Sequence, residues 1–492
     1  MAEKISKSAA PPLTQTAGRG AMWQISGGLW QTIIRLGAST ILARVLRPSD
    51  FGLFGMALLF SEFITVMTNL GMGTGLIAKK NVTDNDLNTY FWCMAGLRLL
   101  MFTIAILSAP LAAIFFKEPR ITAVIRVVAF TFIFSIPSAV STTLLNKAIR
   151  FKTLVLVRGA AALIESGLAV YLVTTTNLAY WGLVIPMLVS SFFMEGTIFY
   201  ISQWRPHFVW ERQSFRYLFK FGINGLGFSI TNYLHQNVDY LFVGRFLGPA
   251  YLGLYEFAYK IPHLVLDRIS RPVGSVVLPA LASLRGDDER LIVGFIKAVR
   301  YVTLVAYPML GGLAMVAGNL VPVVWGAQWL PIVRPLQILC LCAALRCTFQ
   351  PVASIFYCKE RPDVPFKFSL VCTFITFIVV GICGQYYGLL GVSLGMLLST
   401  FTYLYMLSVA FKFVGVSQFK FYIELVPSVS LAMIVLCCTY VAQVEFEYLL
   451  KSKLAILIAT ILSGSAIYIF CFLVFFKKTK KEVLETISVI IG

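Results

Sequence analysis

The sequence predicts an all-α integral membrane protein with about 14 transmembrane helices, arranged as two pseudo-symmetric six-helix lobes and two further C-terminal helices. Three observations lead to this prediction. The chain of 492 residues is 58% hydrophobic and only 13% charged, apolar stretches recur along its whole length, and a short motif repeats halfway through it. A soluble core cannot bury so much apolar surface, so we expect lipid to be the solvent of this chain.

Charged or Gly/Pro-rich breaks divide the chain into apolar segments that are long enough to cross roughly 30 Å of hydrocarbon as helices. The segments of the first half lie near residues 21–45, 51–78, 87–115, 121–145, 153–175 and 179–202. Those of the second half lie near 215–246, 250–282, 291–317, 331–357, 364–385, 388–411, 422–443 and 453–476. The expected division is a cytoplasmic tail (1–20), an N-lobe (21–205), a C-lobe (206–415), helices 13 and 14 (416–478) and a second cytoplasmic tail (479–492).

The distribution of Lys and Arg predicts the side of the membrane that each loop faces, because cytoplasmic loops retain positive charge. The loops of one side and both tails hold about 23 of these residues, against about 7 on the other side. Both termini are therefore expected in the cytoplasm. The net charge of +19 is then a feature of membrane topology, and nucleic acid is not an expected partner. The longest polar connection, residues 203–214, is the expected hinge between the lobes.

The motifs of several other protein classes are missing from the sequence. It contains no CxxC pair, no HExxH and no GxxxxGK[ST], so neither a metal site, a cofactor nor a nucleotide-driven pump is expected. Most of the ten cysteines fall inside apolar segments and are interpreted as free thiols. A membrane glycosyltransferase or polymerase needs a large extracytoplasmic loop, which the expected spans leave no room for. We therefore expect no enzyme and no catalytic residue.

A repeat relates the two lobes. Residues 44–58 (RVLRPSDFGLFGMAL) match residues 245–259 (RFLGPAYLGLYEFAY) at a constant offset of 201 (245 − 44), with six identical positions. Six expected spans separate the copies. This even number predicts lobes of parallel topology, related by an axis along the membrane normal. Two such lobes are typical of a carrier that opens alternately to the two sides of the membrane.

The first helix of each lobe carries a polar stripe. The stripe of the first lobe consists of Gln24, Gln31 and Arg35, and that of the second of Asn232, His235, Gln236 and Asp239. At the offset of 201 residues, Gln31 aligns with Asn232 and Arg35 with Gln236. Because polar groups that face lipid are costly, both stripes are expected to line a water-filled central cavity.

The segments VLRPSDFGLFGMAL, DYLFVGRFLGPAYLGLYEFAYKIP and VGSVVLPALASL resemble the polysaccharide transport family. This family includes the Wzx-type flippases of the multidrug/oligosaccharidyl-lipid/polysaccharide exporter superfamily, and the resemblance is closest to its colanic-acid-type branch. It implies a bacterial inner-membrane flippase that moves undecaprenyl-diphosphate-linked oligosaccharide units to the outer leaflet for surface polysaccharide synthesis. The implied partners are this lipid-linked oligosaccharide, membrane lipids and the polysaccharide polymerase machinery.

The negatively charged diphosphate of such a lipid is expected to bind positively charged side chains in a water-filled cavity. The candidates are the Arg residues deepest in the expected spans together with stripe amides: Arg35, Arg98, Arg158, Arg268, Arg271, Arg300, Gln31, Asn232 and Gln236. The alternative for each Arg is a structural pair with an acid, or a long side chain that reaches the membrane interface. Three further residues are interpreted as such interface anchors: Arg126, Arg334 and Arg346.

Coupling to an ion gradient needs a group in the cavity that titrates or binds a cation. Asp239, with His235 one turn away, is the first candidate, and its charge is expected to sit in water. The other candidates are Glu62, Glu165, Glu195, Glu256 and Lys260. The alternative for His235 is an interhelical hydrogen bond. The alternative for Glu165 is a pair with Arg158 on the same helix.

The eighth expected helix carries the largest set of charges on one face: Glu256, Lys260, Asp267 and Arg271. A wet face fits this pattern, and so do two internal ion pairs, one between the first two residues and one between the last two. Pro262 and Pro272 interrupt the same helix and permit it to bend.

A multidrug or organic-cation antiporter of the same superfamily is the alternative function. Such a carrier favours an acidic cavity, whereas basic residues outnumber acidic ones inside the expected spans. The sequence identifies neither the sugar unit nor the coupling ion.

Overall fold

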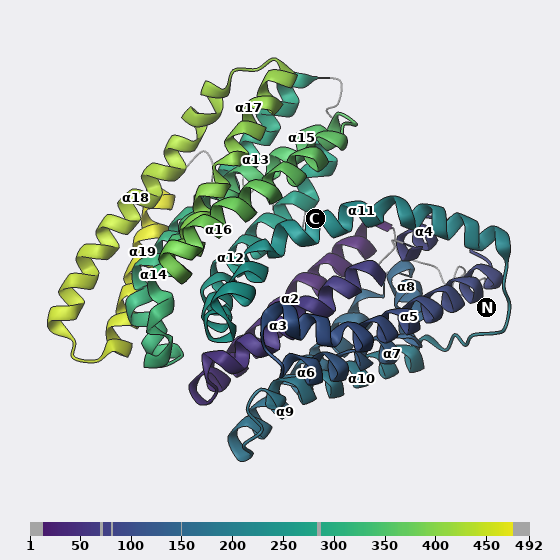
Figure 1. Ribbon diagram of the computed structural model, residues 1–492. Helices are drawn as coiled ribbons and strands as arrows, with labels where there is room; N and C mark the ends of the chain where they lie inside the picture. The colour runs from purple at the N-terminus through teal and green to yellow at the C-terminus, as the bar shows by residue number, and fades with distance from the viewer. Residues whose placement is uncertain (1–12, 69–71, 80–81, 149, 283–286, 476–492) are drawn as a thin grey trace. The chain divides into compact units, whose positions relative to one another are not determined.

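A computed structural model of the chain describes residues 13–68, 72–79, 82–148, 150–282 and 287–475, and these residues are helical almost throughout, with no strand among them (Figure 1). The chain divides into two compact units, which we describe separately. The first consists of Met1–Asn237 with Gly248–Gly253, and the second of Val238–Leu247 with Leu254–Gly492. The long helices α11 and α12 each contribute residues to both units.

The helices of the first half are α2 (Leu13–Val45), α3 (Pro48–Thr68), α4 (Met72–Ala78), α5 (Asp84–Phe116), α6 (Ile121–Val128), α7 (Phe130–Ser135), α8 (Ser138–Lys147), α9 (Phe151–Thr175), α10 (Trp181–Ser202) and α11 (Arg212–Phe242). Those of the second half are α12 (Pro249–Ala282), α13 (Asp288–Val324), α14 (Val333–Phe349), α15 (Ala353–Cys358), α16 (Asp363–Thr400), α17 (Thr402–Val414), α18 (Gln418–Leu449) and α19 (Lys453–Phe475). Short irregular helical turns cover Val243–Leu247, Ala327–Ile332 and Gln350–Val352.

The described helices confirm the predicted all-α membrane class. Nine of them are long and apolar enough to cross a membrane, and a bent pair gives a tenth span. Every expected span coincides with helical residues, although α2, α11 and α12, which carry the polar stripes and charges, are not among the nine. Large apolar side chains lie on the outside, such as Leu107 and Ile114 of α5, which are 73% and 71% exposed. The number of fourteen spans stays a prediction.

One expected span is broken in the structure. Residues 121–145 were expected as a single helix, but the axes of Ile121–Ser135 and Ser138–Lys147 meet at 57°. Pro137 stands at the start of α8, where it has no N–H to donate and where its ring clashes with a continuous helix. The break interrupts the helical hydrogen-bond pattern at the end of α7.

A second break was expected and is found. The helix α16 covers the two spans 364–385 and 388–411 in part, and the structure gives Gly388 a φ of 56° and a ψ of −134°. Glycine reaches this left-handed region without a steric penalty. The chain therefore turns between two helices at the position that the sequence predicts.

The polar connection after α10 is bound to the start of α5. The side chain of Asn88 accepts from the backbone N–H of His207 (2.7 Å), and that of Thr89 accepts from the N–H of Glu211 (3.0 Å). The indole of Trp92 donates to the carbonyl of His207 (3.0 Å). These bonds fix the path of the connection within the first unit. Its role as a hinge stays a prediction.

In each unit one helix packs against several others. In the first unit α9 packs against α2 on one side and α10 on the other, and in the second α13 packs against α14, α18 and α19 (Figure 1). The last two helices, α18 and α19, also pack against each other. The second unit has an aromatic core that includes Phe295, Phe411 and Phe421. In the first unit α4, α5 and α8 share a core around Tyr90 and Phe91.

The two copies of the repeated motif cross inside the first unit. A Cβ atom on Gly52 would lie 1.7 Å from the carbonyl oxygen of Pro249, and one on Gly253 would lie 1.9 Å from the carbonyl oxygen of Pro48. Because Gly52 and Gly253 are equivalent positions of the repeat, this crossing is symmetric. Two helix backbones approach so closely only where neither carries a side chain.

Candidate functional site

The first candidate pair joins α2 to α9. Nη2 of Arg35 lies 3.0 Å from Oε2 of Glu165, and the side chain of Arg35 remains 61% exposed. The alternative interpretation, in which Glu165 pairs with Arg158, is wrong. Seven residues separate those two side chains by about 10 Å along the helix axis, whereas the packing of α2 on α9 brings Arg35 alongside Glu165.

Two further candidates lie at the break between α7 and α8. Arg98 of α5 donates to the carbonyl of Ser135, the last residue of α7. Glu195 of α10 accepts from the hydroxyl of Ser138, the first residue of α8. A cation at a helix C-terminus and an anion at a helix N-terminus each stabilise the backbone groups that a break leaves unsatisfied. These contacts support the structural interpretation of both residues.

The other candidates of the first unit lie on helix surfaces. Arg158 is exposed on α9, and Glu62 is exposed on α3. The stripe residues Gln31 and His235 are partly buried, whereas Asn232 and Gln236 are exposed.

The candidate Arg300 holds two helices of the second unit together. Its Nη1 lies 3.0 Å from Oε2 of Glu424, which joins α13 to α18. One turn further, the hydroxyl of Thr303 donates to that of Ser428 over the same distance. Arg300 therefore has the interhelical partner that the structural interpretation expects.

The charged side chains of α12 differ in burial. Glu256 is partly buried, and Lys260 and Arg268 are exposed. Nδ1 of His263 lies 3.4 Å from Oδ2 of Asp267, one turn away. The predicted pair of Asp267 with Arg271 lies outside the described residues, because the side chain of Arg271 is not among them.

Asp239 lies in a buried network of the second unit. Its carboxylate is 0% exposed, and Oδ2 accepts from the hydroxyl of Tyr255 at 2.6 Å. The ring of Tyr240 packs edge-on against those of Tyr255 and Tyr259, with centroids 5.3 Å and 5.4 Å away. Nη1 of Arg346 donates to the hydroxyl of Tyr259 at 3.0 Å. The expectation that Asp239 sits in water is therefore wrong: α12 covers the last turns of α11.

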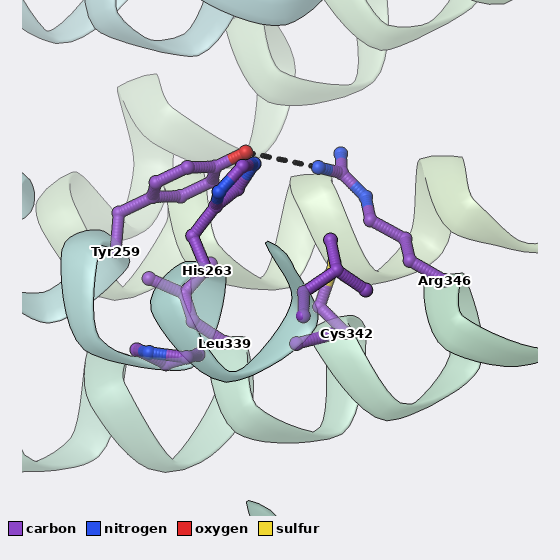
Figure 2. A pocket seen from close by; sticks show the side chains of 8 residues that line it. Tyr259, His263, Leu339, Cys342 and Arg346 are labelled. Carbon is purple, nitrogen blue, oxygen red and sulfur yellow. Dashed lines mark hydrogen bonds between the residues drawn. The ribbon is translucent and has the colours of Figure 1, made fainter. Parts of the chain in front are cut away.

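A small pocket lies beside this network, between α12 and α14 (Figure 2). Figure 2 shows the rings of Tyr259 and His263 side by side, with the guanidinium of Arg346 across from them. Leu339 and Cys342 contribute apolar wall. The cavity volume is about 10 Å³, which is room for roughly one water molecule. The interpretation of Arg346 as an interface anchor is wrong, because its guanidinium turns into the unit and bonds Tyr259.

Two buried atoms of the network have no hydrogen-bond partner within the described part of the chain: Oδ1 of Asp239 and Nε of Arg346. A buried polar group without a partner is costly, so it calls for a specific explanation such as a proton, a water molecule or a ligand. Oδ1 of Asp239 can therefore still accept a hydrogen bond, and Nε of Arg346 can still donate one.

Sequence reasoning missed four residues of this site: Tyr255, Tyr259, His263 and Arg346. The signal for the first three is present, because with Asp267 they recur every fourth residue along one stripe of α12. The face chosen from the sequence begins at Glu256, immediately beside this stripe. No sequence signal relates Arg346 to them, because α14 reaches α12 only through the fold.

The chain is similar to proteins that are named for the biosynthesis of polymers. It is 28% identical to a lipopolysaccharide biosynthesis protein, WzxC, of Escherichia coli (strain K12), over 76% of this chain and 78% of that protein. It is 26% identical to the teichuronic acid biosynthesis protein TuaB of Bacillus subtilis (strain 168), over 72% of this chain and 74% of that protein.

Two solved structures share the fold. The lipid II flippase MurJ in an inward closed conformation superposes with a TM-score of 0.77 at 16% identity, covering 93% of this chain and 99% of that one. An inward-facing multidrug resistance MATE transporter superposes with a TM-score of 0.64 at 15% identity, covering 78% and 94%. The family model described as "polysaccharide biosynthesis protein" matches residues 41–334. The chain therefore belongs to the polysaccharide biosynthesis protein family.

Proposed function

We propose that this chain is a flippase that carries lipid-diphosphate-linked oligosaccharides from the cytoplasmic to the outer leaflet of the bacterial cytoplasmic membrane. The observation that carries the proposal is membership of the polysaccharide biosynthesis family together with a fold like that of a lipid II flippase over 93% of the chain. The relatives are named for lipopolysaccharide, teichuronic acid and succinoglycan. A carrier of lipid-linked precursors is a role that suits polymers of such different composition.

In this proposal the two lobes alternate their access around a polar cavity, both termini lie in the cytoplasm, and the polymerase machinery receives the product. Turnover draws on an ion gradient through Asp239, the most deeply buried of the candidate acids. A carrier needs no catalytic residue, because no bond of the substrate is broken.

The proposed headgroup site is the exposed face of α2 and α9. Arg35 contacts Glu165 and is largely exposed, and Arg158 shares the face of Glu165 because seven residues are close to two helical turns. Arg35 therefore contacts the carboxylate of Glu165, and Arg158 adds a second positive charge about 10 Å further along α9. A diphosphate carries more charge than a carboxylate and bonds guanidinium groups in the same forked geometry, so it displaces Glu165 from Arg35.

Binding of the lipid-linked oligosaccharide to purified protein tests this site. We expect Arg35→Ala to weaken binding roughly ten-fold at low salt, with a smaller loss at high salt because ions screen the attraction. Glu165→Gln is expected to strengthen binding, since it removes the competing carboxylate. Arg120→Ala is the matched control: Arg120 pairs with Glu118 at 2.8 Å outside the spans of the same unit and is 52% exposed. Equal weakening by Arg35→Ala and Arg120→Ala would contradict the site.

A reconstituted flipping assay tests the function itself. Vesicles that contain the protein should expose fluorescent lipid-linked oligosaccharide to an added quencher faster than protein-free vesicles. The alternative, a multidrug antiporter, has the MATE fold in its favour, although that likeness covers less of this chain. Proton- or sodium-driven uptake of organic cations without flipping would overturn the proposal in favour of this alternative.

A further inference from the structure

A row of polar side chains runs along one stripe of α12. Its members recur every fourth residue: Tyr255, Tyr259, His263 and Asp267. We call this row the α12 ladder. It extends over about 18 Å of helix, because each residue adds about 1.5 Å. All four residues belong to the second unit, as does Asp239.

Consecutive members of the α12 ladder are in contact. The hydroxyl of Tyr255 bonds Asp239 at 2.6 Å, and the ring of Tyr255 lies 5.9 Å from that of Tyr259. The ring of Tyr259 stacks on the imidazole of His263 at 5.1 Å. Nδ1 of His263 lies 3.4 Å from Asp267.

The two ends of the α12 ladder differ in access to solvent. Asp239 is 0% exposed, whereas the side chain of Asp267 is 28% exposed. The row therefore connects a carboxylate sealed inside the unit with one at the surface of the unit.

The pocket of Figure 2 lies beside the middle of the α12 ladder. Its polar groups are the hydroxyl of Tyr259, the imidazole of His263 and the guanidinium of Arg346, and its size admits roughly one water molecule. A buried water needs two to four polar partners, and Tyr259, His263 and Arg346 are the lining residues that carry suitable groups. A water at this place would bridge the hydroxyl and the imidazole, whose rings stack without a direct hydrogen bond.

We propose that the α12 ladder is the proton route between Asp239 and the aqueous surroundings, which deepens the proposed function by naming its coupling path. The imidazole of His263 takes a proton from Asp267 at one nitrogen and releases one from the other. Tyr259 and Tyr255 each accept a proton at oxygen as they donate their own forward. Their rings are in contact without a bond between the two hydroxyls, so this hop requires a rotation of Tyr259 that brings its O–H to the oxygen of Tyr255. Oδ1 or Oδ2 of Asp239 receives the last one. Each step breaks one O–H or N–H bond and forms another, and the route returns to its first state by reorientation.

The chemistry of the row favours a proton over a metal cation. Hydroxyl and imidazole groups donate and accept protons, whereas hard cations take six or more oxygen ligands. A proton needs one acceptor, and Oδ1 of Asp239 is a buried acceptor that has no hydrogen-bond partner among the residues described. The groups that face Asp239 electrostatically are Tyr255, Tyr259 and Arg346, and those around Arg346 include Tyr403 and Cys342.

Arg346 acts in this route as a positioning residue. Its bond to the hydroxyl oxygen of Tyr259 occupies one lone pair and orients the O–H bond away from the guanidinium. The Tyr259 proton is thereby directed along the ladder. Arg346→Lys keeps the charge but loses the planar geometry, so it should slow proton flux while Asp239 stays in a cationic environment.

The test measures substrate-dependent proton flux with an internal pH dye, alongside flipping of the lipid-linked oligosaccharide, in the same vesicles. We expect Tyr259→Phe and His263→Gln to lower proton flux about ten-fold or more, and by a larger factor than they lower flipping. Tyr307→Phe is the matched control. It removes another tyrosine hydroxyl of the second unit, which bonds the hydroxyl of Thr348 at 2.6 Å and does not belong to the α12 ladder. Both rates should therefore stay at the wild-type level.

The outcomes separate this inference from the function on which it rests. If Asp239→Asn abolishes proton flux while the two ladder variants keep it, the ladder is overturned and the coupling acid stands. If the wild type flips its substrate without moving protons, the ladder is overturned and the flippase stands. If the wild type does not flip at all, the proposed function fails. Ladder variants that lose heat stability but keep the ratio of protons to flipped substrate would show that the row only supports packing, which also overturns the ladder.

Discussion

Glu195 in the first unit and Asp239 in the second are both acids at membrane depth, but different groups hold them. Glu195 accepts from Ser138 at the start of α8, while Arg98 donates to the carbonyl of Ser135 at the end of α7. Both contacts stand at a break in the span, where backbone groups need partners. The acid and the Arg of the first unit together replace the helical hydrogen bonds that the break removes.

The network around Asp239 consists of hydrogen bonds between side chains of α11, α12 and α14. Asp239 bonds Tyr255, and Tyr259 bonds Arg346. In the part of the chain that the structure describes, the carboxylate and the guanidinium each have one buried atom without a hydrogen-bond partner. The difference teaches how to separate roles for charges inside a membrane. A charge that repairs the backbone is structural, whereas a charge with unused bonding capacity is available for function.

The largest expected effect is that two acid-to-amide substitutions change different properties, one the proton coupling and the other the thermal stability. Asp239→Asn should reduce proton-coupled transport about 100-fold, because the amide cannot take the proton, while its oxygen still accepts from Tyr255. Glu195→Gln should leave the ratio of protons to flipped substrate unchanged and lower the thermal unfolding midpoint instead. Flux assays and unfolding scans on both variants check this. A loss of coupling in Glu195→Gln with retained coupling in Asp239→Asn would break the comparison.

A medium effect is expected where the break itself is altered. Arg98→Met should lower the free energy of unfolding by about 2 kcal/mol, since it leaves the carbonyl of Ser135 without its charged donor. Pro137→Ala restores an N–H and removes the clash that breaks the helix, so in that background the same substitution should cost less. Unfolding of the four proteins of this cycle in detergent gives the coupling between the two sites. Strict additivity would mean that Arg98 does not serve the break.

The smallest effect is expected for a neutral bond of the second unit. Thr303→Val removes the hydroxyl that donates to Ser428 between α13 and α18. Interhelical hydrogen bonds of this kind are worth about 0.6 kcal/mol in membranes, so the unfolding midpoint should fall slightly and proton coupling should not change. A coupling defect in Thr303→Val would show that transport responds to any loosening of the second unit, and the special role of Asp239 would lose its support.

The sequence was sufficient for the helices and for the repeat, because hydropathy and spacing are local properties. It predicted the turn at Gly388 from the break between two apolar segments. It did not predict the 57° bend before α8, although Pro137 was present, because proline inside a membrane span is often accommodated by a mild kink.

The partners of the charges were harder to predict, because each depends on which helices the fold brings together. Glu165 pairs with Arg35, at a distance of 130 residues along the chain, and not with the nearer Arg158. Asp239 shares the spacing of an exposed stripe but lies beneath α12. Arg346 has the sequence surroundings of an interface anchor. In each case the partner depends on tertiary packing, which the periodicity of a single helix does not give.

The crossing of Gly52 and Gly253 bears on how this chain originated. Equivalent residues of the two copies touch each other, and each glycine faces the carbonyl of the proline that begins the opposite helix, α12 or α3. A protein of half this length, carrying the motif once, would make the same contact with a second copy of itself as a two-fold homodimer. Gene fusion would then have turned one self-complementary glycine into two separate positions. Each can mutate independently of the other, but a side chain at either one would clash with the backbone of the opposite helix.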